Sequence, residues 1–441
     1  MSGYDVIVLG GGTAGCALAA RLSEEPSRQV CLVEAGPDYG PYAAGGWPAD
    51  ILDARQLAFS HSWETDREDR SQLRARILGG CSSHNACVVL AGAPSDYDEW
   101  GDGWRHAELE PYLARARAQL RTRPTAPEAL SPWHRAWAEG AGEDAIVHDV
   151  NIVDGVRWNA AFAYLDEARE RPNLTILGGA LADRLLLEGD RAVGAVTSAG
   201  ELRAATVVVA AGAYGSPGIL LRTGLTPERG LPVGEGLLDH VGVGVGWAAT
   251  DRLAAAMAGF GGQVPMAQVT VKLRCGDCPP GLWDAFVFPG IEPTEGGWEI
   301  SAAAFAMKPV SRGRVRLNGH DPRTPLAVEH GFLADERDAT VLTTALQQLR
   351  ELATHPAIAA HTAAEVRPGA DVPAERHVRE SARGFFHPTG TCAIGRVVDA
   401  RGRVFGIDGL VVADASIMPT IPRANTNLST AAVAERLAET I

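Results

Sequence analysis

The sequence predicts an α/β fold in two parts: a parallel-sheet domain that begins the chain and a smaller domain built on an antiparallel sheet. Residues 4–9 are a short apolar run rich in β-branched residues, followed by closely spaced glycines and a helical stretch at 16–22. Residues 29–33 form a second apolar run, which completes a βαβ unit. Between about 234 and 308, apolar or alternating segments are separated by turns, a pattern typical of an antiparallel sheet.

Length and composition narrow the class of protein. The chain has 441 residues, which exceeds one compact domain and fits two or three. Hydrophobic residues make up 46% and charged residues 21%, as in ordinary soluble enzymes. The formal net charge of -14 disfavours nucleic acid and anionic membranes as partners, because both carry negative charge. No run of about 20 apolar residues is present, so we expect no membrane span.

The N-terminus and the cysteines bear on location. The opening residues lack the basic region and long apolar run of a secretion signal. The 7 cysteines are scattered and odd in number, which favours a reducing compartment. Cys275 and Cys278 form a CxxC pair, but no further ligands stand at the spacing of a zinc site. We therefore expect a cytoplasmic protein without a metal site, either a monomer or a homodimer.

The remaining elements follow from apolar periodicity and from turn residues. Helices are expected at 106–122, 131–142, 215–222, 335–354 and 427–439. Strands are expected at 174–177, 181–187, 192–197, 206–210, 241–247, 267–273, 283–289, 298–305 and 409–413.

A glycine motif, Gly10-x-Gly12-x-x-Gly15, follows the first strand and opens the first helix. These glycines permit a tight turn, the approach of the backbone to a pyrophosphate, and close packing of helix and strand. The N-terminus of the helix favours negative charge. Glu34 ends the second strand, where it can accept hydrogen bonds from a ribose 2′-hydroxyl and would repel a 2′-phosphate. The pattern predicts a bound FAD or NAD rather than NADP.

A second glycine-rich segment is RARILGGCSSHN at residues 74–85. Its Gly79-Gly80 pair and small hydroxyl residues indicate a backbone that closely contacts a ligand. The segment resembles the first signature of the glucose–methanol–choline (GMC) flavoprotein oxidoreductases. Four later segments resemble further motifs of that family in the same order: GAYGSPGILLRTG at 212–224, MKPVSRGRVRL at 307–317, HPTGTC at 387–392 and VADASIMP at 412–419. The resemblance covers essentially the whole chain, which is shorter than usual for the family.

The resemblance implies FAD as the cofactor, bound by a Rossmann-like domain made of residues 1–155, 174–235 and 386–441. The smaller substrate-binding domain, with the antiparallel sheet, would comprise residues 156–173 and 236–385. Asp414 would lie at the ribityl–pyrophosphate region, and Ala182 would offer its backbone to the adenine. The full set of expected cofactor-binding residues is Gly10, Gly12, Thr13, Ala14, Gly15, Glu34, Ala35, Leu78, Gly79, Gly80, Ser83, His84, Asn85, Ala86, Ala182, Ala211, Gly212, Asp414, Ala415, Asn425 and Thr426.

His84 is the residue that would attach the flavin covalently. The string GGCSSHN is most similar to the choline oxidases of the family, in which a histidine at this position is bonded to the flavin. A neutral imidazole nitrogen is a competent nucleophile toward the flavin 8α carbon. The alternative is a histidine that only hydrogen-bonds near the flavin. Those oxidases carry a serine two residues further on, where this chain has Ala86.

His387 and Asn425 are the expected catalytic pair. Oxidation of an alcohol by hydride transfer requires removal of the hydroxyl proton, for which histidine is the usual base. His387 lies in an aromatic and turn-rich segment and matches the family's base. Asn425 matches the second active-site position, where it would hydrogen-bond the substrate oxygen, and Asn427 is its rival two residues on. Thr426 and Asn427 would then face the pyrimidine edge of the flavin.

Together these expectations describe an FAD-dependent enzyme that oxidises an alcohol to an aldehyde or ketone by hydride transfer to the flavin N5. The alcohol is expected to be a primary one. The electrons would pass to molecular oxygen or another acceptor. The expected substrate is a polar, choline-like alcohol or a bacterial specialised metabolite. Candidates for an aromatic cage around a cation are Trp104, Trp133, Trp247, Trp283 and Trp298, although tryptophans at such spacing are more often core residues. The alternative is an FAD-containing lyase or decarboxylase on the same fold, without net redox.

Overall fold

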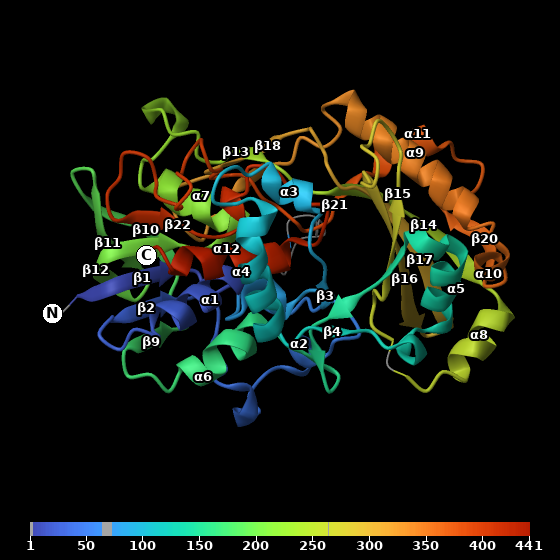
Figure 1. Cartoon of the computed structure of the whole chain (residues 1–441), viewed down its shortest axis with the longest axis horizontal. Coiled ribbons are helices and arrows are strands. Elements are labelled where there is room, and N and C mark those ends of the chain that lie inside the picture. The colour runs from blue at the N-terminus through green and yellow to red at the C-terminus, as the bar shows by residue number, and fades with distance from the viewer. Residues whose placement is uncertain (1–2, 64–72, 263) are drawn as a thin grey trace.

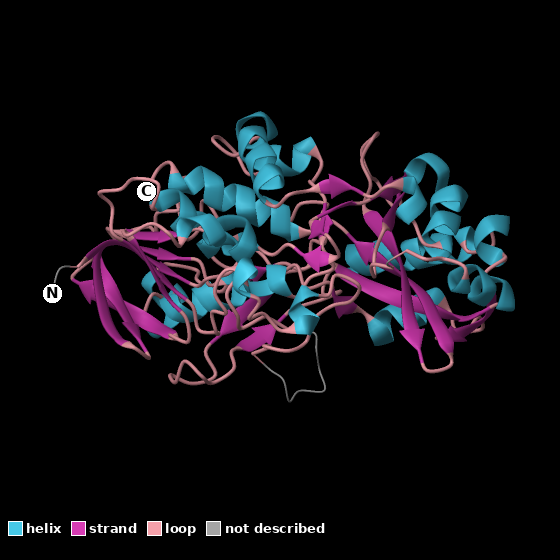
Figure 2. Cartoon of the chain, turned by 90° about the horizontal axis from the view of Figure 1, so that it is seen from below, coloured by secondary structure: helices cyan, strands magenta, loops and turns pink. Residues whose placement is uncertain are grey.

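The computed structural model of the chain describes residues 3–63, 73–262 and 264–441. Two large sheets stand at opposite ends of the molecule, with helices and loops between them, as Figure 1 and Figure 2 show. The N-terminus lies at the end that carries the parallel strands (Figure 1). This arrangement confirms the predicted α/β fold with a second, antiparallel sheet.

The first sheet has a parallel core. β1 (Tyr4–Leu9) lies between β2 (Val30–Val33) and β12 (Gly200–Val209) and pairs with both in parallel. β9 (Leu174–Leu177) extends the sheet beyond β2, and β22 (Leu410–Val412) pairs with the last residues of β12. All of β2 and the last four residues of β1 are buried, as expected for strands that are covered on both faces.

A pair of antiparallel strands extends this sheet. β10 (Ala182–Glu188) pairs with β11 (Arg191–Thr197), which pairs with the beginning of β12. β12 begins at Gly200, six residues before the expected strand at 206–210. Its first half alternates between exposed and half-buried positions, so it lacks the continuous apolar run that marks its second half.

Helices from both ends of the chain pack beside the parallel strands. α1 (Thr13–Leu22) begins directly after the glycine motif and packs against α12 (Thr426–Ala438), the last helix. α4 (His106–Gln119) packs on the other side of α12, and α7 (Gly212–Arg222) follows β12 directly. The first and last helices therefore share one core, and their N-termini lie at the same cavity.

The second sheet is antiparallel throughout. Its strands, in spatial order, are β20 (Thr362–Arg367), β14 (Val241–Ala249), β17 (Gly297–Ala306), β16 (Ala285–Thr294), β15 (Val269–Leu273) and β5 (Ala145–Val147), with β21 (Arg383–Gly384) paired to β14.

The two faces of this sheet have different neighbours. In β14, Val241, Val243 and Val245 alternate with glycines and belong to a hydrophobic core that includes α5 (Pro132–Ala141) and α9 (Glu336–Leu352). Because side chains alternate across a strand, the glycines between these valines point away from that core. The glycine-bearing face borders the cavity described below.

Two segments pack against a different sheet from the one that the predicted domain division implies. Residues 132–147 fall in the predicted FAD-binding part, yet α5 and β5 join the antiparallel sheet, because Trp133 and Trp137 pack beside Trp247 and β5 pairs with β15. Residues 156–173 fall in the predicted substrate-binding part, yet their apolar side chains join the core around α1. The division into two functional parts otherwise stays a prediction.

The other elements are short. The helices among them are η1 (Tyr42–Ala44), α2 (Ala49–Leu52), η2 (Gly80–Ser83), α3 (Pro94–Asp98), η3 (Pro127–Ala129), η4 (Gly142–Asp144), η5 (Ala161–Leu165), α6 (Asp166–Ala168), η6 (Pro227–Arg229), α8 (Asp251–Ala258), α10 (Pro356–Ala359), α11 (Ala374–Ser381) and η7 (Ala415–Ile417). The strands are β3 (Val88–Val89), β4 (Arg123–Pro124), β6 (Asp149–Val150), β7 (Ile152–Val153), β8 (Val156–Arg157), β13 (Glu235–Leu237), β18 (Gly313–Arg316) and β19 (Ala327–Glu329).

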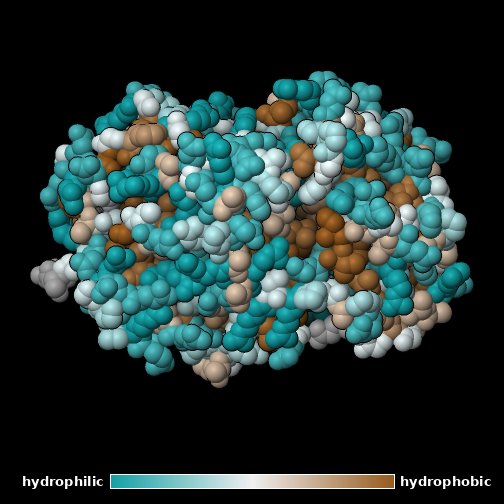
Figure 3. Space-filling model, in the orientation of Figure 1, coloured by the Kyte–Doolittle hydropathy of each residue, from teal (hydrophilic) through white to brown (hydrophobic). Residues whose placement is uncertain are grey.

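Two surface properties complete the description. No helix within the described ranges is long and apolar enough to cross a membrane. Hydrophobic side chains gather right of the centre in Figure 3, on the side of the molecule that carries the antiparallel sheet.

Candidate active site

One cavity of about 700 Å³ lies between the two sheets and takes its walls from both. The ends of β1, β2 and β12 and the starts of α1 and α12 form one wall, and β14, β16 and β17 form the other. Both expected catalytic residues and most of the expected cofactor-binding residues line it. They are Gly10, Gly12, Thr13, Ala14, Glu34, Ala35, Gly80, His84, Asn85, Ala86, Ala182, Ala211, Gly212, His387, Asp414, Ala415, Asn425 and Thr426.

Glycines bring three stretches of backbone together at the parallel-sheet wall. A Cβ atom on Gly15 would overlap the carbonyl oxygen of Gly10, so only glycine allows α1 to approach the end of β1. A Cβ atom on Gly80 would lie 2.6 Å from Cα of Gly12, so the second glycine-rich segment lies directly against the first. The result is a cradle of backbone with little side chain in it, which suits a pyrophosphate.

Four expected cofactor-binding residues do not line the cavity, namely Gly15, Leu78, Gly79 and Ser83. They lie behind its wall and hold it. The amide of Gly79 donates to the carbonyl oxygen of Gly11 at 2.7 Å, and the Ser83 hydroxyl donates to the carbonyl oxygen of Leu78 at 3.2 Å. These contacts fix the turn that presents Gly80 to the cavity.

Glu34 is buried at the end of β2, with 7% of its surface exposed. Its carboxylate accepts hydrogen bonds from the amide of Gly11 at 2.8 Å and the amide of Gly36 at 2.7 Å. Burial outweighs these bonds and raises the pKa of Glu34 to about 7. Each carboxylate oxygen keeps a second acceptor position, which a ribose hydroxyl can use.

Asp414 joins the C-terminal segment to the start of α7. Its Oδ2 accepts from the amide of Gly212 at 2.8 Å and from the Ser216 hydroxyl at 2.5 Å, and its Oδ1 accepts from the amide of Ser416 at 2.8 Å. Burial raises the pKa of this carboxyl despite these three bonds. Asp414 lies at the cavity wall, and it also fixes the turn after β12.

His84 is neutral in its buried position, where 6% of its surface is exposed. Burial lowers its pKa to about 4. Its Nε2 lies 2.6 Å from the carbonyl oxygen of Ser60, which can only accept, so the proton is on Nε2. Nδ1 therefore carries the free lone pair.

A chain of hydrogen bonds fixes the tautomer of His387. The Nε2 atom of His240 lies 3.0 Å from the carbonyl oxygen of Pro422, so it carries the proton of that ring. Burial lowers the pKa of His240 to about 3, so its Nδ1 is a bare acceptor. His387 Nδ1, 2.9 Å away, must donate to it. The Nε2 atom of His387 is thereby left without a proton at the cavity.

Asn425 lies at this unprotonated nitrogen. Its Nδ2 is 3.3 Å from His387 Nε2, and its Oδ1 is buried without a partner among the described residues. Asn427 is engaged elsewhere, because its Oδ1 accepts a 2.7 Å hydrogen bond from the Thr13 hydroxyl. Of the two asparagines that the sequence offered, Asn425 is therefore the one beside His387.

His387 is held in place by its backbone as well as its ring. Its amide donates to Oδ1 of Asp239 at 2.8 Å. Burial, the neighbouring His240 ring and the Arg74 guanidinium all lower the pKa of His387 well below its usual range. Burial raises the pKa of Asp239 to about 7, against the effect of Arg74. His387 is therefore neutral at neutral pH.

Three phenylalanines form the aromatic part of the opposite wall. Phe385 and Phe305 stack with their centroids 3.8 Å apart, and Phe288 meets Phe385 edge-on at 4.9 Å. Phe385 also lies 4.5 Å from the His387 ring. A Cβ atom on Gly242 would overlap the Phe305 ring, so the glycines of β14 make room for this aromatic layer.

Of the two interpretations that the sequence left open for five tryptophans, the aromatic cage is wrong and the core position is correct. None of Trp104, Trp133, Trp247, Trp283 and Trp298 lines the cavity. Trp104, Trp133 and Trp247 are buried in the two hydrophobic cores, and Trp283 stacks on Phe286 at 5.8 Å. Their side chains fill the interior, as large aromatic residues usually do.

Sequence reasoning missed His240, Asp239 and the phenylalanine wall. Asp239 and His240 precede a predicted strand, and nothing in their spacing connects them with His387, which is almost 150 residues away. The phenylalanines come from β16, β17 and the segment before His387. The alternation of valine and glycine in β14 was a usable signal, because it marks a strand with one face in a core and one face left open.

The parallel sheet carries a backbone cradle that suits a dinucleotide. Across the cavity, below the antiparallel sheet, lies an unprotonated histidine. These two features together define a dinucleotide-dependent oxidoreductase. Comparison with known proteins gives the family. Two family models described as GMC oxidoreductase match residues 4–242 and 309–434. The chain therefore belongs to the GMC oxidoreductase family, which confirms the predicted FAD cofactor and the prediction of an oxidoreductase that acts on an alcohol.

Individual relatives match over nearly their whole length. The chain is 32% identical to a 5-(hydroxymethyl)furfural oxidase of Methylovorus sp., covering 99% of this chain and 98% of that protein. It is 30% identical to an oxygen-dependent choline dehydrogenase of Burkholderia multivorans, covering 99% and 93%. Among solved structures, pyridoxine 4-oxidase from Mesorbium loti superposes with a TM-score of 0.86 at 27% identity, covering 99% of each chain.

The residues at the cavity fit FAD. The glycine backbones of α1 and of the segment at 79–80 leave room for a pyrophosphate that any side chain would fill. Glu34 offers acceptors for ribose hydroxyls, and Thr426 and Asn427 stand at the N-terminus of α12, whose dipole favours negative charge. The alignment with the furfural oxidase runs over 536 positions, so many positions of that relative have no counterpart in this chain of 441 residues, as its shortness suggested.

Proposed function

We propose that this enzyme oxidises a neutral aromatic primary alcohol to the aldehyde, with His387 as the base and molecular oxygen as the final electron acceptor. The observation that carries the proposal is the unprotonated Nε2 of His387, fixed by His240 and exposed to the cavity beside Asn425. FAD, when bound, supplies the hydride acceptor. The chain itself must bind the alcohol, orient it and take its proton.

The first chemical role is proton removal. His387 Nε2 takes the proton of the substrate hydroxyl, and its pKa below the usual range keeps it unprotonated in the free enzyme. Asn425 hydrogen-bonds the substrate oxygen through its side-chain amide and holds the alcohol carbon in a reactive orientation. The imidazolium that results stays hydrogen-bonded through Nδ1–H to His240, so the ring does not have to turn during the reaction.

The substrate class follows from the walls of the cavity. The phenylalanine layer next to His387 offers flat apolar surface to an aromatic ring. The carboxylates at the described walls are Glu34 and Asp414, both on the cofactor side and both hydrogen-bonded to backbone amides. Arg74 lines the same cavity and would repel a cation. These charges favour a neutral aromatic alcohol over a quaternary ammonium alcohol.

The relatives support the same substrate class and acceptor. The furfural oxidase and the pyridoxine oxidase are named for oxidase activity on molecules with aromatic rings. The choline dehydrogenase is named for a cationic substrate, and phenylalanine faces can also bind a cation weakly. Choline is therefore the competing substrate. These relatives are two oxidases and a dehydrogenase, which favours net oxidation over the lyase or decarboxylase alternative.

The test is anaerobic reduction of the flavin by benzyl alcohol, choline and 1-hexanol, followed by air. We expect benzyl alcohol to bleach the flavin absorbance with at least tenfold higher efficiency than choline. Oxygen should then restore the colour and yield hydrogen peroxide. Faster bleaching by choline would reverse the substrate assignment. Slow reoxidation by air with rapid reoxidation by a dye would replace oxygen by another acceptor.

We further propose that His84 attaches FAD covalently, with a hydrogen-bonding role as the alternative. The neutral ring at the cavity wall supports attachment, since a protonated imidazole has no lone pair to react. Acid-precipitated protein should keep its yellow colour, and H84A should release it. We also propose a cytoplasmic location, which the free cysteines support, and a monomer or homodimer.

A further inference from the structure

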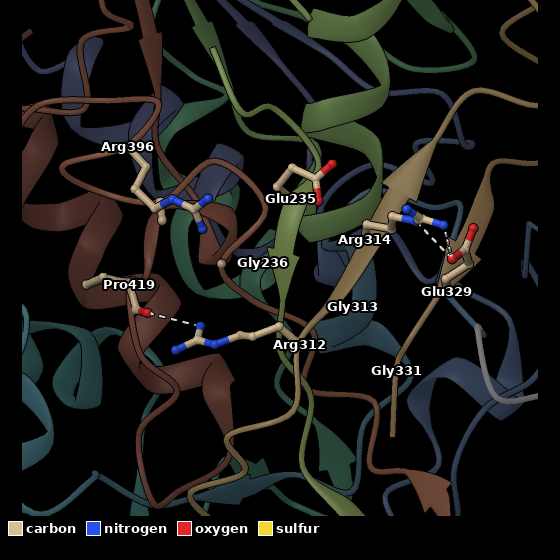
Figure 4. Close-up of a pocket in the computed structure, with 11 residues that line it drawn as sticks. Glu235, Gly236, Arg312, Gly313, Arg314, Glu329, Gly331, Arg396 and Pro419 are labelled. Atoms are coloured by element: carbon tan, nitrogen blue, oxygen red, sulfur yellow. Dashed lines mark hydrogen bonds and ion pairs between the residues drawn. The ribbon is translucent and has the colours of Figure 1, made fainter. Parts of the chain in front are cut away.

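Figure 4 shows the residues around a second cavity, of about 740 Å³, which Gly390 lines three residues after His387. Its walls come from β13, β18, β19 and two C-terminal loops, and none of its lining residues lines the active-site cavity. The lining residues are Glu235, Gly236, Arg312, Gly313, Arg314, Glu329, Gly331, Gly390, Ala393, Arg396 and Pro419. None of the functions assigned above uses this cavity.

The acidic side chains of this cavity are already neutralised. Glu329 forms an ion pair with Arg314 at 2.7 Å, which Figure 4 shows at one edge of the cavity. Glu235 forms an ion pair with Arg316 on the neighbouring strand. Since each carboxylate has its own arginine, neither is available to the remaining cations.

Two arginines of the cavity have no acidic partner among the described residues. Arg312 donates one hydrogen bond, from Nη1 to the carbonyl oxygen of Pro419 at 3.4 Å. The Arg396 guanidinium makes neither a hydrogen bond nor an ion pair within the described part of the chain. Figure 4 shows both guanidinium groups on the same side of Gly236, one above it and one below it.

The two guanidinium groups repel each other. Burial and the charge of Arg396 together lower the pKa of Arg312. Both arginines are exposed, so solvent screens much of their repulsion, and an anion bound between them would remove the remainder. The surrounding protein does not supply this anion, although its net charge is -14. Arginine forks match the oxygen atoms of phosphates and carboxylates.

We propose that this cavity binds a ligand through an oxyanion group, a phosphate or a carboxylate, held between Arg312 and Arg396. The site is separate from the proposed chemistry, since it needs neither the flavin nor the alcohol. Its charges are those of an anion site: two ion pairs balance the carboxylates, and two exposed arginines at the wall have no acidic partner among the described residues.

The test measures binding of inorganic phosphate and of malonate to the FAD-loaded enzyme by calorimetry, with chloride at equal ionic strength as the reference. The loaded enzyme is needed because its glycine cradle is then occupied and cannot bind phosphate. R396A removes one guanidinium from the cavity. R401A is the matched control, because Arg401 is an exposed arginine of the same C-terminal region outside the cavity, and its removal changes the net charge equally. R312K keeps the charge and removes the fork.

We expect saturable binding of at least one of the two anions to the wild type. R396A should weaken it at least tenfold, R312K should weaken it less, and R401A should leave it unchanged. Stronger binding of phosphate than malonate would assign a phosphate-bearing ligand, and the reverse order a carboxylate-bearing one. The proposal is overturned if neither anion binds beyond the effect of chloride, or if R396A and R401A weaken binding equally.

Discussion

The two walls of the active-site cavity are built in different ways. The cofactor wall is mainly backbone, and its shape depends on glycines at the ends of β1 and α1 and at 79–80. The substrate wall is mainly side chain, with the phenylalanine layer and His387 supplied by strands and loops far apart in sequence. A cofactor shared by a family can be held by one fixed motif, whereas the alcohol is recognised by positions that are free to vary.

The difference extends to polar groups. On the cofactor wall, Glu34 and Asp414 are satisfied by nearby backbone amides. On the substrate wall, Asn425 Oδ1 is buried without a partner among the described residues. An unpaired polar atom costs free energy unless a ligand completes it. The substrate wall thus keeps an unpaired acceptor beside the base, whereas the two carboxylates of the cofactor wall are paired.

The largest effect is expected from Gly15→Ala, which tests whether backbone alone shapes the cofactor wall. The new Cβ would overlap the Gly10 carbonyl, so α1 must move away from β1. We expect loss of FAD and poor folding, measured as flavin content and Tm of the purified protein. Gly261→Ala is the control, since no atom of the described residues lies within 4 Å of a Cβ there. Normal flavin content in Gly15→Ala would show that the cradle tolerates a side chain.

His387→Ala tests the substrate wall without touching the cradle. We expect flavin reduction by the alcohol to slow by about 10²–10⁴-fold, the usual contribution of a general base. FAD content should be unchanged, because the glycine cradle and Glu34 hold the cofactor. Stopped-flow reduction under anaerobic conditions measures the rate. His320→Ala, at an exposed position, is the control. A rate close to that of the wild type would exclude His387 as the base.

His240→Ala separates a positioning role from a merely structural one. Without the acceptor at Nδ1 of residue 240, His387 can place its proton on either nitrogen, so we expect reduction to slow by about 10–100-fold. The neighbouring His240 ring lowers the pKa of His387, so its removal should raise that pKa. The rate needs the unprotonated base, and its acidic limb should therefore move to higher pH. His240→Asn, which keeps an acceptor near the same place, should restore part of the rate.

The cofactor wall could be predicted from the sequence because its signals are local. Gly10, Gly12 and Gly15 lie within one turn and one strand end, and Glu34 follows at the end of the next strand. The spacing of such a motif requires one local backbone geometry, which does not depend on contacts with distant parts of the chain. The same reasoning placed most strands and helices to within a few residues, with β12 as an exception, since its first half depends on pairing with β11.

The substrate wall could be predicted only in part. His387 and Asn425 were found through resemblance to a family, and the spacing of the two residues does not show that their side chains meet. His240 is brought to His387 by the antiparallel pairing of β14 with β21, which no local pattern encodes. The sequence left the role of the tryptophans open, because a large aromatic residue looks the same in sequence whether it fills a core or lines a pocket.

Phe305→Ala should change substrate preference and leave the chemistry intact. Loss of the stacked ring removes apolar surface that contacts an aromatic substrate equally before and during the reaction. We expect KM for benzyl alcohol to rise roughly tenfold with kcat within about twofold, and the preference for benzyl alcohol over 1-hexanol to shrink. Phe405→Ala, at a phenylalanine with 43% of its surface exposed, is the control. Equal KM values in both variants would remove Phe305 from the substrate wall.

The smallest expected effect concerns Glu34. It tests whether the cofactor wall keeps its structure without a charged side chain at this position. Burial raises the pKa of this carboxyl to about 7, above the usual value of about 4.3 in an unfolded chain. Between these two pH values the folded protein holds a proton on Glu34 that the unfolded chain has lost. The stability that Glu34 contributes is therefore present at low pH and is lost as pH rises through about 7.

In FAD-free protein, Glu34→Gln should match the wild-type Tm at pH 5 and exceed it by a few degrees at pH 8. In the loaded enzyme a ribose hydroxyl donates to the charged carboxylate, so the advantage of glutamine at pH 8 should shrink or reverse. A Tm difference between the two proteins that stays constant from pH 5 to pH 8 would mean that Glu34 remains ionised in the fold, and that the two amides of Gly11 and Gly36 outweigh its burial.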